Sequence, residues 1–553
     1  MASDHTSSRL QGRFGLHAML MREWRPARKL PLPWEIAILG ALLLLALVLR
    51  FATLTHDSLW IDEGYTLASA GQSFQLLFTV PFDTHPALHF AVVKLSTLFL
   101  DGAVAVRAPS AVFSVLMLAP IYFLARRLLG PVGALVTVAG LTLSFTMLVY
   151  AVNGRNYTQL LLLLMLAAWS LQVMAARFSE GASLFSRSLL GWWGIYTLSA
   201  LAALYSHNTA VLYLFVLNGV FCAWALGGGP KAAFTATWKL GVVNAPALII
   251  WAPWLSVMVG TSGVFNWLEH QPPTTALITL AATIGPNNVP SLAMGAFFLA
   301  VLAGGLLCLV RPGWTLPLIF ANAAAFPLFI WLIGFAFKPV YMERIILPAA
   351  IGGALALGYL AAHGRRRWLT TGLTAAALLA SAGSSASFLM RGDAHSNLGA
   401  QLVQDWRGAV TAYDAPGAVL LICDSFTWPA VDFYRSDADV WVHHDGGVWD
   451  MTIEDWRANY GQPLAGTDAV ERNSYSPWMD GAQIDWPDVV AQAPTMVFLK
   501  PNTLCNDGEP EQIRARLAAS GYGFIGREVW RNVEAETWRR DLGLSALPGP
   551  APE

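Results

Sequence analysis

The first 390 residues alternate long apolar runs with short polar segments. A hydrocarbon core of about 30 Å needs about 20 apolar residues in a helix, because every backbone polar group in lipid must bond within its segment. Some runs contain no Asp, Glu, Lys or Arg over their whole length, as between Arg187 and Lys231 and between Arg311 and Lys338. We expect about eleven spans, at 34–54, 108–125, 131–150, 156–176, 188–206, 208–226, 240–259, 291–310, 313–337, 345–362 and 368–388.

Charged residues between these runs predict the orientation of the chain. Residues 1–33 are basic and no small-residue cleavage site follows the first span, so we expect an uncleaved anchor with a cytoplasmic N-terminus. The segment 85–100 is short and carries Lys94, which favours a helix in the outer interface rather than a span. Residues 55–107 then form the first outer loop, and Lys or Arg falls in each predicted cytoplasmic loop, at 126–127, 177 and 187, 231 and 239, 311, and 365–367. If 85–100 crossed the membrane, every later loop would change sides.

From about residue 391 the pattern changes, because no apolar run is longer than a strand. Helices are predicted at 401–413, 428–434 and 511–520, and strands at 418–423, 440–443, 495–499 and 523–530. This alternation indicates a small α/β domain with a mainly parallel sheet, and 445–490 is expected to be a long ordered loop. The predicted organisation is a basic N-terminus (1–33), a polytopic α-helical membrane domain (34–390) and a soluble extracytoplasmic α/β domain (391–553).

Composition supports lipid as the main solvent. Of 553 residues, 55% are hydrophobic and 12% charged, and the mean hydropathy is +0.50, whereas soluble domains have about 25% charged residues. A net charge of -1 argues against a nucleic-acid binder, which must neutralise phosphates. The four cysteines are too few for a disulfide scaffold. Cys423 and Cys505, both in the predicted exported domain, either form a disulfide or remain separate thiols.

With this topology, polar residues near the spans gather at their outer ends. Asp62 and Glu63 lie close after the first span, and a paired carboxylate near the apolar boundary has a raised proton affinity that suits a general base. Arginines at the same level can neutralise a phosphate leaving group. The alternative for each residue is a charged side chain that reaches into the lipid headgroups. The other members of this outer group are Asp83, His85, His89, Arg107, Arg155, His207, Glu269, Lys338, Glu343 and Arg344.

Short motifs in a fixed order carry a resemblance to a known family. They are Asp62-Glu63-Gly64-Tyr65-Thr66, His85-Pro86-Ala87-Leu88-His89, Arg107-Ala108-Pro109-Ser110, the segment from Tyr150 to Tyr157 with Arg155, Tyr205-Ser206-His207, Pro253-Trp254-Leu255 and Arg344-Ile345-Ile346-Leu347-Pro348. With them the sequence resembles the GT-C glycosyltransferases of the protein O-mannosyltransferase and aminoarabinose transferase type (glycosyltransferase family 39), and more narrowly their bacterial relatives. It departs from the family pattern at Ala87, His89 and Asn153, where Pro, Tyr and Glu are usual.

The resemblance implies a glycosyltransferase of the bacterial inner membrane. It would move a sugar from a polyprenyl-phosphate donor to an envelope acceptor, which is a lipid, a glycan or a protein. In a one-step inverting displacement, Asp62 beside Glu63 would be the base. Arg344 and Arg155 are the first candidates for the donor phosphate, followed by Arg107 and Lys338. The further candidates for contact with the donor's sugar or phosphate are Tyr65, Tyr157, Tyr341, His85 and His207.

The sequence leaves a metal requirement open. His85 and His89 are four residues apart and therefore on one face of a helix. Together with Asp62 they are candidate ligands for a divalent ion.

The competing function is a polytopic transporter or lipid flippase. Transporters commonly contain paired broken helices near the membrane midplane and internal repeats. Here the spans are uninterrupted and the polar residues crowd one face, which favours the transferase. A purely structural envelope protein would explain none of the motifs.

Overall fold

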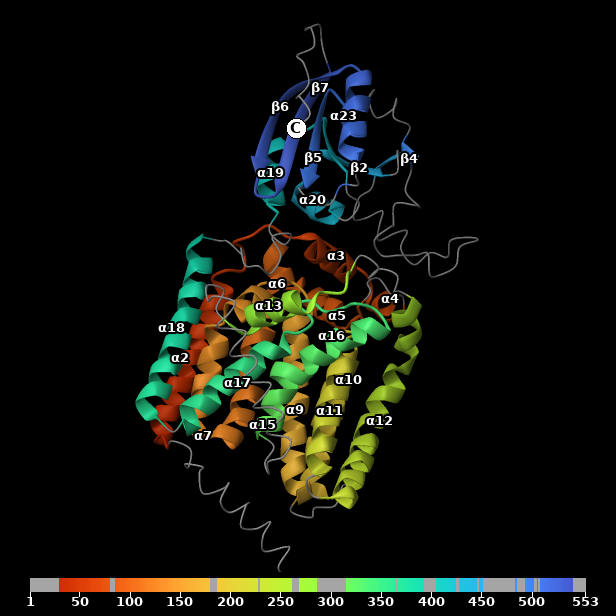
Figure 1. Cartoon of the computed structure of the whole chain (residues 1–553). Coiled ribbons are helices and arrows are strands. Elements are labelled where there is room, and N and C mark those ends of the chain that lie inside the picture. The colour runs from red at the N-terminus through yellow and green to blue at the C-terminus, as the bar shows by residue number, and fades with distance from the viewer. Residues whose placement is uncertain are drawn as a thin grey trace, which may run out of the picture.

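The computed structural model places a bundle of long helices beneath a smaller sheet domain (Figure 1). It describes residues 29–79, 85–179, 186–226, 229–260, 268–285, 315–364, 366–391, 404–423, 427–444, 447–450, 483–484, 493–501, 505 and 508–540. The predicted span at 291–310 and Asp83 lie outside these residues, as does most of the expected loop 445–490.

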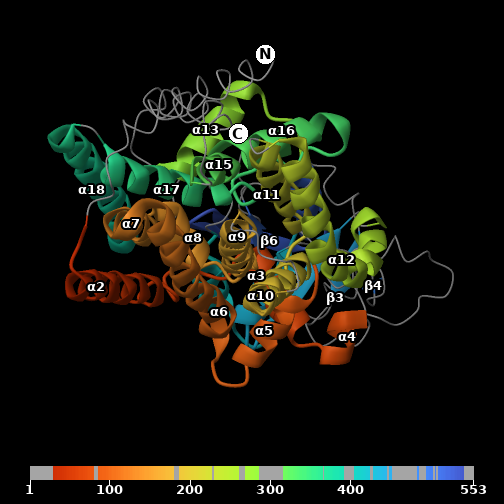
Figure 2. The same cartoon turned by 90° about the horizontal axis from the view of Figure 1, so that it is seen from below.

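At the other predicted spans the bundle has one helix or two or three consecutive helical elements. Its elements are α2 (Leu32–Phe51), α6 (Gly102–Leu116), α7 (Leu118–Thr142), α8 (Phe145–Ala151), α9 (Tyr157–Ser179), α10 (Arg187–Leu204), α11 (Ala210–Ala225), α12 (Pro230–Gly260), α13 (Pro273–Ile284), α15 (Thr315–Phe320), the π-helix η3 (Ala321–Ala325), α16 (Phe326–Ala336), α17 (Pro348–His363) and α18 (Arg367–Arg391). In both views α2 and α18 lie at one side of the bundle and α12 at the other (Figures 1 and 2). Among the described residues, six helical segments are long and apolar enough to cross a membrane, which agrees with the expected polytopic helical fold.

A turn at Gly130 divides α7 into two helices. Gly130 has a φ of 75°, a left-handed conformation that glycine adopts without the steric cost of a Cβ atom, and Pro131 starts the second half. The turn lies between the predicted spans 108–125 and 131–150, as the sequence indicated. Near it, Arg126 donates to the buried Glu35 of α2 at 2.7 Å.

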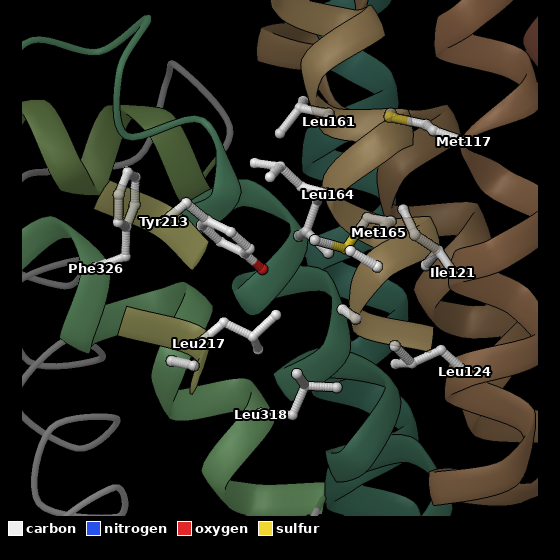
Figure 3. Close-up of a cluster of buried hydrophobic side chains, with 14 of the residues drawn as sticks. Met117, Ile121, Leu124, Leu161, Leu164, Met165, Tyr213, Leu217, Leu318 and Phe326 are labelled. Atoms are coloured by element: carbon white, nitrogen blue, oxygen red, sulfur yellow. The ribbon is translucent and has the colours of Figure 1, made fainter. Parts of the chain in front are cut away.

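The core of the bundle is apolar and closely packed. Figure 3 shows side chains of α7, α9, α11, α15 and α16 meeting around Tyr213, whose hydroxyl donates to Asn322 Oδ1 of η3 at 2.7 Å. Small residues let α7 and α17 approach closely, because a Cβ atom added at Gly358 would clash with the carbonyl oxygen of Gly133 and with Thr137 Oγ1.

Three short helices cover the end of the bundle that faces the sheet domain (Figure 1). They are α3 (Ile61–Ala70), α4 (Phe74–Thr79) and α5 (Leu88–Ser96). At a rise of about 1.5 Å per residue, α5 is too short to cross a bilayer. This length fits the predicted outer-interface helix within 85–100.

The sheet domain, residues 404–540, has a mixed rather than a mainly parallel sheet. Its elements are α19 (Trp406–Tyr413), β1 (Ala418–Ile422), α20 (Trp428–Tyr434), β2 (Asp439–His444), β3 (Gly447–Asp450), β4 (Gln483–Ile484), β5 (Thr495–Pro501), α23 (Glu509–Ala519), β6 (Tyr522–Trp530) and β7 (Val533–Arg540), with strand order β4-β3-β2-β1-β5-β7-β6. Among the described strands, the parallel pairings are β1 with β2 and β1 with β5. The remaining described pairings are antiparallel. The predicted mainly parallel sheet is therefore wrong.

The error has a physical cause in β7, which the sequence pattern did not indicate. A tight turn at Arg531 and Asn532 returns β6 directly into β7. Glu534 and Glu536 of β7 are buried, and these charges hide the apolar pattern of a strand. Arg514 of α23 compensates this burial, since its Nη2 lies 2.5 Å from Glu536 Oε1. Carboxylates are rarely buried without such a partner.

A disulfide joins Cys423, which follows β1, to Cys505, which follows β5. Their Cα atoms are 5.4 Å apart and the two positions are separated by 82 residues. Of the two alternatives that the sequence left open, the structure has the bonded one.

The sheet domain packs directly on the short helices at the end of the bundle. Ala68 of α3 and Phe90 of α5 belong to the same buried apolar cluster as Trp406 and Trp428 of the sheet domain. Gly64 of α3 allows a close approach of α20, because an added Cβ atom would lie 3.0 Å from the backbone nitrogen of Ala430. The two parts of the chain therefore share a core at this level.

Candidate active site

Asp62 and Glu63 lie in the first turn of α3. Trp60 precedes the helix in an extended conformation, and its N–H donates to Glu63 Oε2 at 3.3 Å. Acidic residues in a first turn also interact favourably with the helix dipole. Neighbouring side chains point in different directions around a helix, so the two carboxylates have different surroundings. Glu63 is fully buried, whereas the Asp62 side chain is 20% exposed.

Glu63 forms a buried ion pair with Arg107 of α6. Arg107 Nε donates to Glu63 Oε1 at 2.7 Å and Nη2 donates to Oε2 at 2.6 Å. Gly154 N also donates to Oε1 at 2.7 Å. This geometry ties the start of α3 to α6 and to the segment before α9.

The remaining donors of Arg107 go to backbone oxygens. They bind the carbonyls of Leu54 at 2.9 Å, Asp57 at 2.8 Å and Ser58 at 2.8 Å. All five N–H donors of this guanidinium are thus used within the protein. The sequence grouped Arg107 with the phosphate-binding candidates, but the structure leaves it no donor for a ligand and makes it a support of the loop between α2 and α3.

Asp62 faces two other arginines. Its Oδ2 lies 3.9 Å from Arg155 Nε and 3.6 Å from Arg344 Nη1. Arg155 is buried, and its Nη1 donates to the Asp62 carbonyl at 3.2 Å and to Thr66 Oγ1 at 3.1 Å. The Arg344 side chain is 27% exposed. A partly exposed carboxylate and a partly exposed guanidinium therefore lie side by side.

Arg344 belongs to the connection between α16 and α17, which also contains Lys338, Tyr341 and Glu343. The Tyr341 hydroxyl donates to the Ala276 carbonyl of α13 at 2.9 Å, which anchors the connection. The sequence placed Glu343 at the outer face but assigned it no role. Burial raises the pKa of its carboxyl well above the usual range, against the smaller opposing effects of Tyr150 and Arg344. The sequence signal that could have identified Glu343 as a site residue is its position directly before Arg344.

Aromatic and imidazole rings form a row beside these charges. The His85 ring is 4.3 Å from that of His207, which is 5.9 Å from the ring of Tyr157. Tyr157 in turn packs edge-on against Tyr150 at 5.2 Å. Burial, with the added repulsion of Arg155 and Arg344, lowers the pKa of His85 well below its ordinary value, so its imidazole is neutral. Tyr65, also on α3, is buried.

The proposed metal ligands do not come together as a binding group. His89 Nδ1 is 2.9 Å from Gln159 Oε1 and Nε2 is 3.3 Å from the Gly154 carbonyl, so both ring nitrogens have partners within the protein. Within the described ranges, no three His, Cys, Asp or Glu residues are placed to hold an ion. The combination of His85, His89 and Asp62 is therefore not a metal site in this arrangement.

The Glu63–Arg107 pair predicts a specific stability pattern. Arg107→Met should destabilise the protein by about 3–5 kcal/mol, because it leaves a buried carboxylate without its partner. Adding Glu63→Gln should recover part of that loss, since the double variant has no unpaired charge. Thermal unfolding of the purified variants measures both effects, and strictly additive losses would contradict the coupling.

The chain is similar to known proteins both in sequence and in fold. Residues 84–257 match the family model described as dolichyl-phosphate-mannose-protein mannosyltransferase. The structure resembles ArnT from Cupriavidus metallidurans in the apo state, with a TM-score of 0.56 and 14% identity, covering 91% of this chain and 98% of that one. The same protein bound to undecaprenyl phosphate gives a TM-score of 0.51 and 15% identity, with the same coverage of both chains. No curated protein sequence matches the chain.

The structural likeness shows the fold, and the family match covers residues 84–257. The prediction of a polytopic helical fold with a C-terminal sheet domain is confirmed, and so is the resemblance that the motifs carried. Residues 84–257 of the chain thus resemble the dolichyl-phosphate-mannose-protein mannosyltransferase family, and the chain as a whole has a multi-pass helical membrane fold like that of ArnT.

Proposed function

We propose that the protein transfers a sugar from a polyprenyl-phosphate donor to an acceptor of the bacterial envelope. The family is described by a dolichyl-phosphate sugar, and ArnT of the same fold binds undecaprenyl phosphate. Both are phosphorylated polyprenyl lipids, which supports the same donor class here. The acceptor is a lipid, a glycan or a protein with a free hydroxyl or amine.

One observation carries this proposal: the partly exposed Asp62 carboxylate lies within 3.9 Å of two guanidinium groups. The arrangement suits a displacement in which negative charge develops on a leaving phosphate. Cations fixed in a partly dry site stabilise such charge more than they would in water. A carboxylate beside them is placed to accept a proton from the attacking group.

The proposed step is a single inverting displacement. The acceptor oxygen or nitrogen forms a bond to the anomeric carbon while the bond from that carbon to the phosphate oxygen breaks. Asp62 takes the acceptor proton, and the polyprenyl phosphate leaves with the electron pair. Glu63 takes no part in the proton transfer, because its two oxygens are bound to Arg107, Gly154 and Trp60.

Arg344 and Arg155 have different roles in the proposed step. Arg344 is the more exposed and is the proposed contact to the donor phosphate. Arg155 is bonded to α3 through Asp62 and Thr66 and holds the base beside that phosphate. The row of His85, His207 and Tyr157 offers a ring surface for the sugar, and neutral His85 adds no competing cation there. Tyr341 supports the connection that carries Arg344, and Tyr65 is buried in α3. Lys338 lies in the same connection as Arg344.

We further propose that the N-terminus is cytoplasmic and that Asp62 and the sheet domain are extracytoplasmic, in the inner membrane. The alternation of basic loops supports this orientation. The shortness of α5 also supports this orientation. A helix of this length does not cross the membrane, so the later loops keep their predicted sides.

The central prediction is that Asp62→Asn lowers turnover by about 10²–10⁴-fold while donor binding is retained. The substitution keeps the shape of the side chain and removes its proton affinity. Arg344→Lys should also lower turnover, because an ammonium cannot replace a planar fork on a phosphate. Glu63→Gln should lower turnover less than Asp62→Asn at equal amounts of folded protein.

The assay uses purified protein in nanodiscs with radiolabelled undecaprenyl-phosphate sugars, beginning with mannose, and envelope extracts as acceptors. Binding of undecaprenyl phosphate alone reports the folded, donor-competent fraction. Unchanged sugar transfer by Asp62→Asn would remove the proposed base.

The orientation has its own prediction. Single cysteines introduced at Glu269 and Asp450 in a background without Cys222 and Cys308 should react with an impermeant maleimide in intact cells, and one at Arg365 should react only after permeabilisation. The reverse pattern would overturn the orientation.

A further inference from the structure

The segment from Leu54 to Trp60 connects α2 to α3 and leads directly to Asp62. It has no regular secondary structure, so its backbone groups need partners from elsewhere. Those partners come from two different parts of the chain.

The membrane bundle supplies one side of this support. Arg107 binds the carbonyl oxygens of Leu54, Asp57 and Ser58, and its ion pair with Glu63 fixes the helix that follows.

The sheet domain supplies the other side. Arg407 of α19 donates to the carbonyls of Thr55 and Asp57, each at 3.2 Å. Ser58 Oγ donates to Asp405 Oδ1 at 2.8 Å. The Leu59 N–H donates to the Tyr434 hydroxyl of α20 at 2.7 Å.

Asp57 is the point at which both sides meet. Its carbonyl oxygen accepts from Arg107 Nη1 at 2.8 Å and from Arg407 Nη2 at 3.2 Å. Its carboxylate forms an ion pair of 2.9 Å with Arg531, in the turn between β6 and β7. The Arg531 carbonyl in turn accepts from Asp405 N at 2.9 Å. Two arginines of the sheet domain therefore act on the residue that the bundle already holds through Arg107.

From this arrangement we infer that Arg407 and Arg531 are positioning residues for Asp62. This inference rests on the proposed function, in which Asp62 is the base. The segment and the first turn of α3 are continuous, so releasing Asp57 moves Asp62 relative to Arg155 and Arg344. Catalysis is sensitive to such movement, because a displacement of about 1 Å can cost about 10²-fold in rate. The sheet domain is thus part of the catalytic apparatus although it contributes no group to the reaction.

The direct packing of α20 on α3 supports the same conclusion. Gly64 lies against Pro429 and Ala430, with an added Cβ atom 3.1 Å from Pro429 Cβ. The sheet domain therefore contacts the Asp62 helix itself as well as the segment before it.

The test compares Arg407→Ala and Arg531→Ala in the full-length protein in nanodiscs. Turnover with the undecaprenyl-phosphate sugar should fall by about tenfold in each, while affinity and stoichiometry for undecaprenyl phosphate stay unchanged. Hydrogen exchange of peptides covering 54–66 should become faster in both variants. Arg531→Lys should retain most of the turnover, because the ion pair to Asp57 is kept.

Arg527→Ala is the matched control. Arg527 belongs to the same β6–β7 hairpin and pairs with Glu534 at 2.9 Å, but not with the 54–60 segment. This variant should keep wild-type turnover and exchange. Equal losses in Arg527→Ala and Arg531→Ala would overturn the inference, because the effect would then be a general one on the hairpin.

The remaining outcomes are also decisive. Wild-type turnover in Arg407→Ala and Arg531→Ala would overturn the positioning role, whether or not exchange is faster. A loss of undecaprenyl phosphate stoichiometry that Arg531→Lys does not rescue would make the arginines purely structural and would likewise overturn it. If Asp62→Asn keeps full activity, the proposed base fails, while the exchange data still report on the contact between the two parts of the chain.

Discussion

The buried ion pair between Glu63 and Arg107 is the constraint on which the end of the bundle beneath the sheet domain depends. Taking two charges out of water costs several kcal/mol per ion and is recovered only with good geometry and additional hydrogen bonds. Here both carboxylate oxygens and all five guanidinium donors are satisfied, by each other and by backbone groups on either side of α3. The pair therefore fixes a loop that has little secondary structure of its own.

This constraint separates the roles of two adjacent carboxylates. Glu63 is buried and both of its carboxylate oxygens are bound within the protein, whereas Asp62 remains partly exposed beside Arg155 and Arg344. The sheet domain adds a second hold on the same loop through Asp57. The proposed base is thus carried on a short helix that contacts both the bundle and the sheet domain.

Much of this architecture could be predicted from the sequence, because apolar runs and loop charges report directly on burial in lipid. Asp62, Arg155 and Arg344 were identified from motifs at the ends of spans. The role of Arg107 was not, since only the structure shows where its donors go. In the sheet domain, β7 escaped prediction because Glu534 and Glu536 are buried with Arg514, and sequence pattern treats buried carboxylates as exposed. The contacts of Arg407 and Arg531 with Asp57 join residues too far apart in the chain for local patterns to relate them.

The most direct test of the account is an experimental structure of the protein with undecaprenyl phosphate bound. We expect the lipid phosphate to contact Arg344, with the Asp62 carboxylate beside it and the Arg107–Glu63 pair unbroken. A phosphate bound to Arg107, or placed at the opposite end of the bundle near Arg126, would contradict the assignment of Asp62 and its two arginines as the catalytic centre.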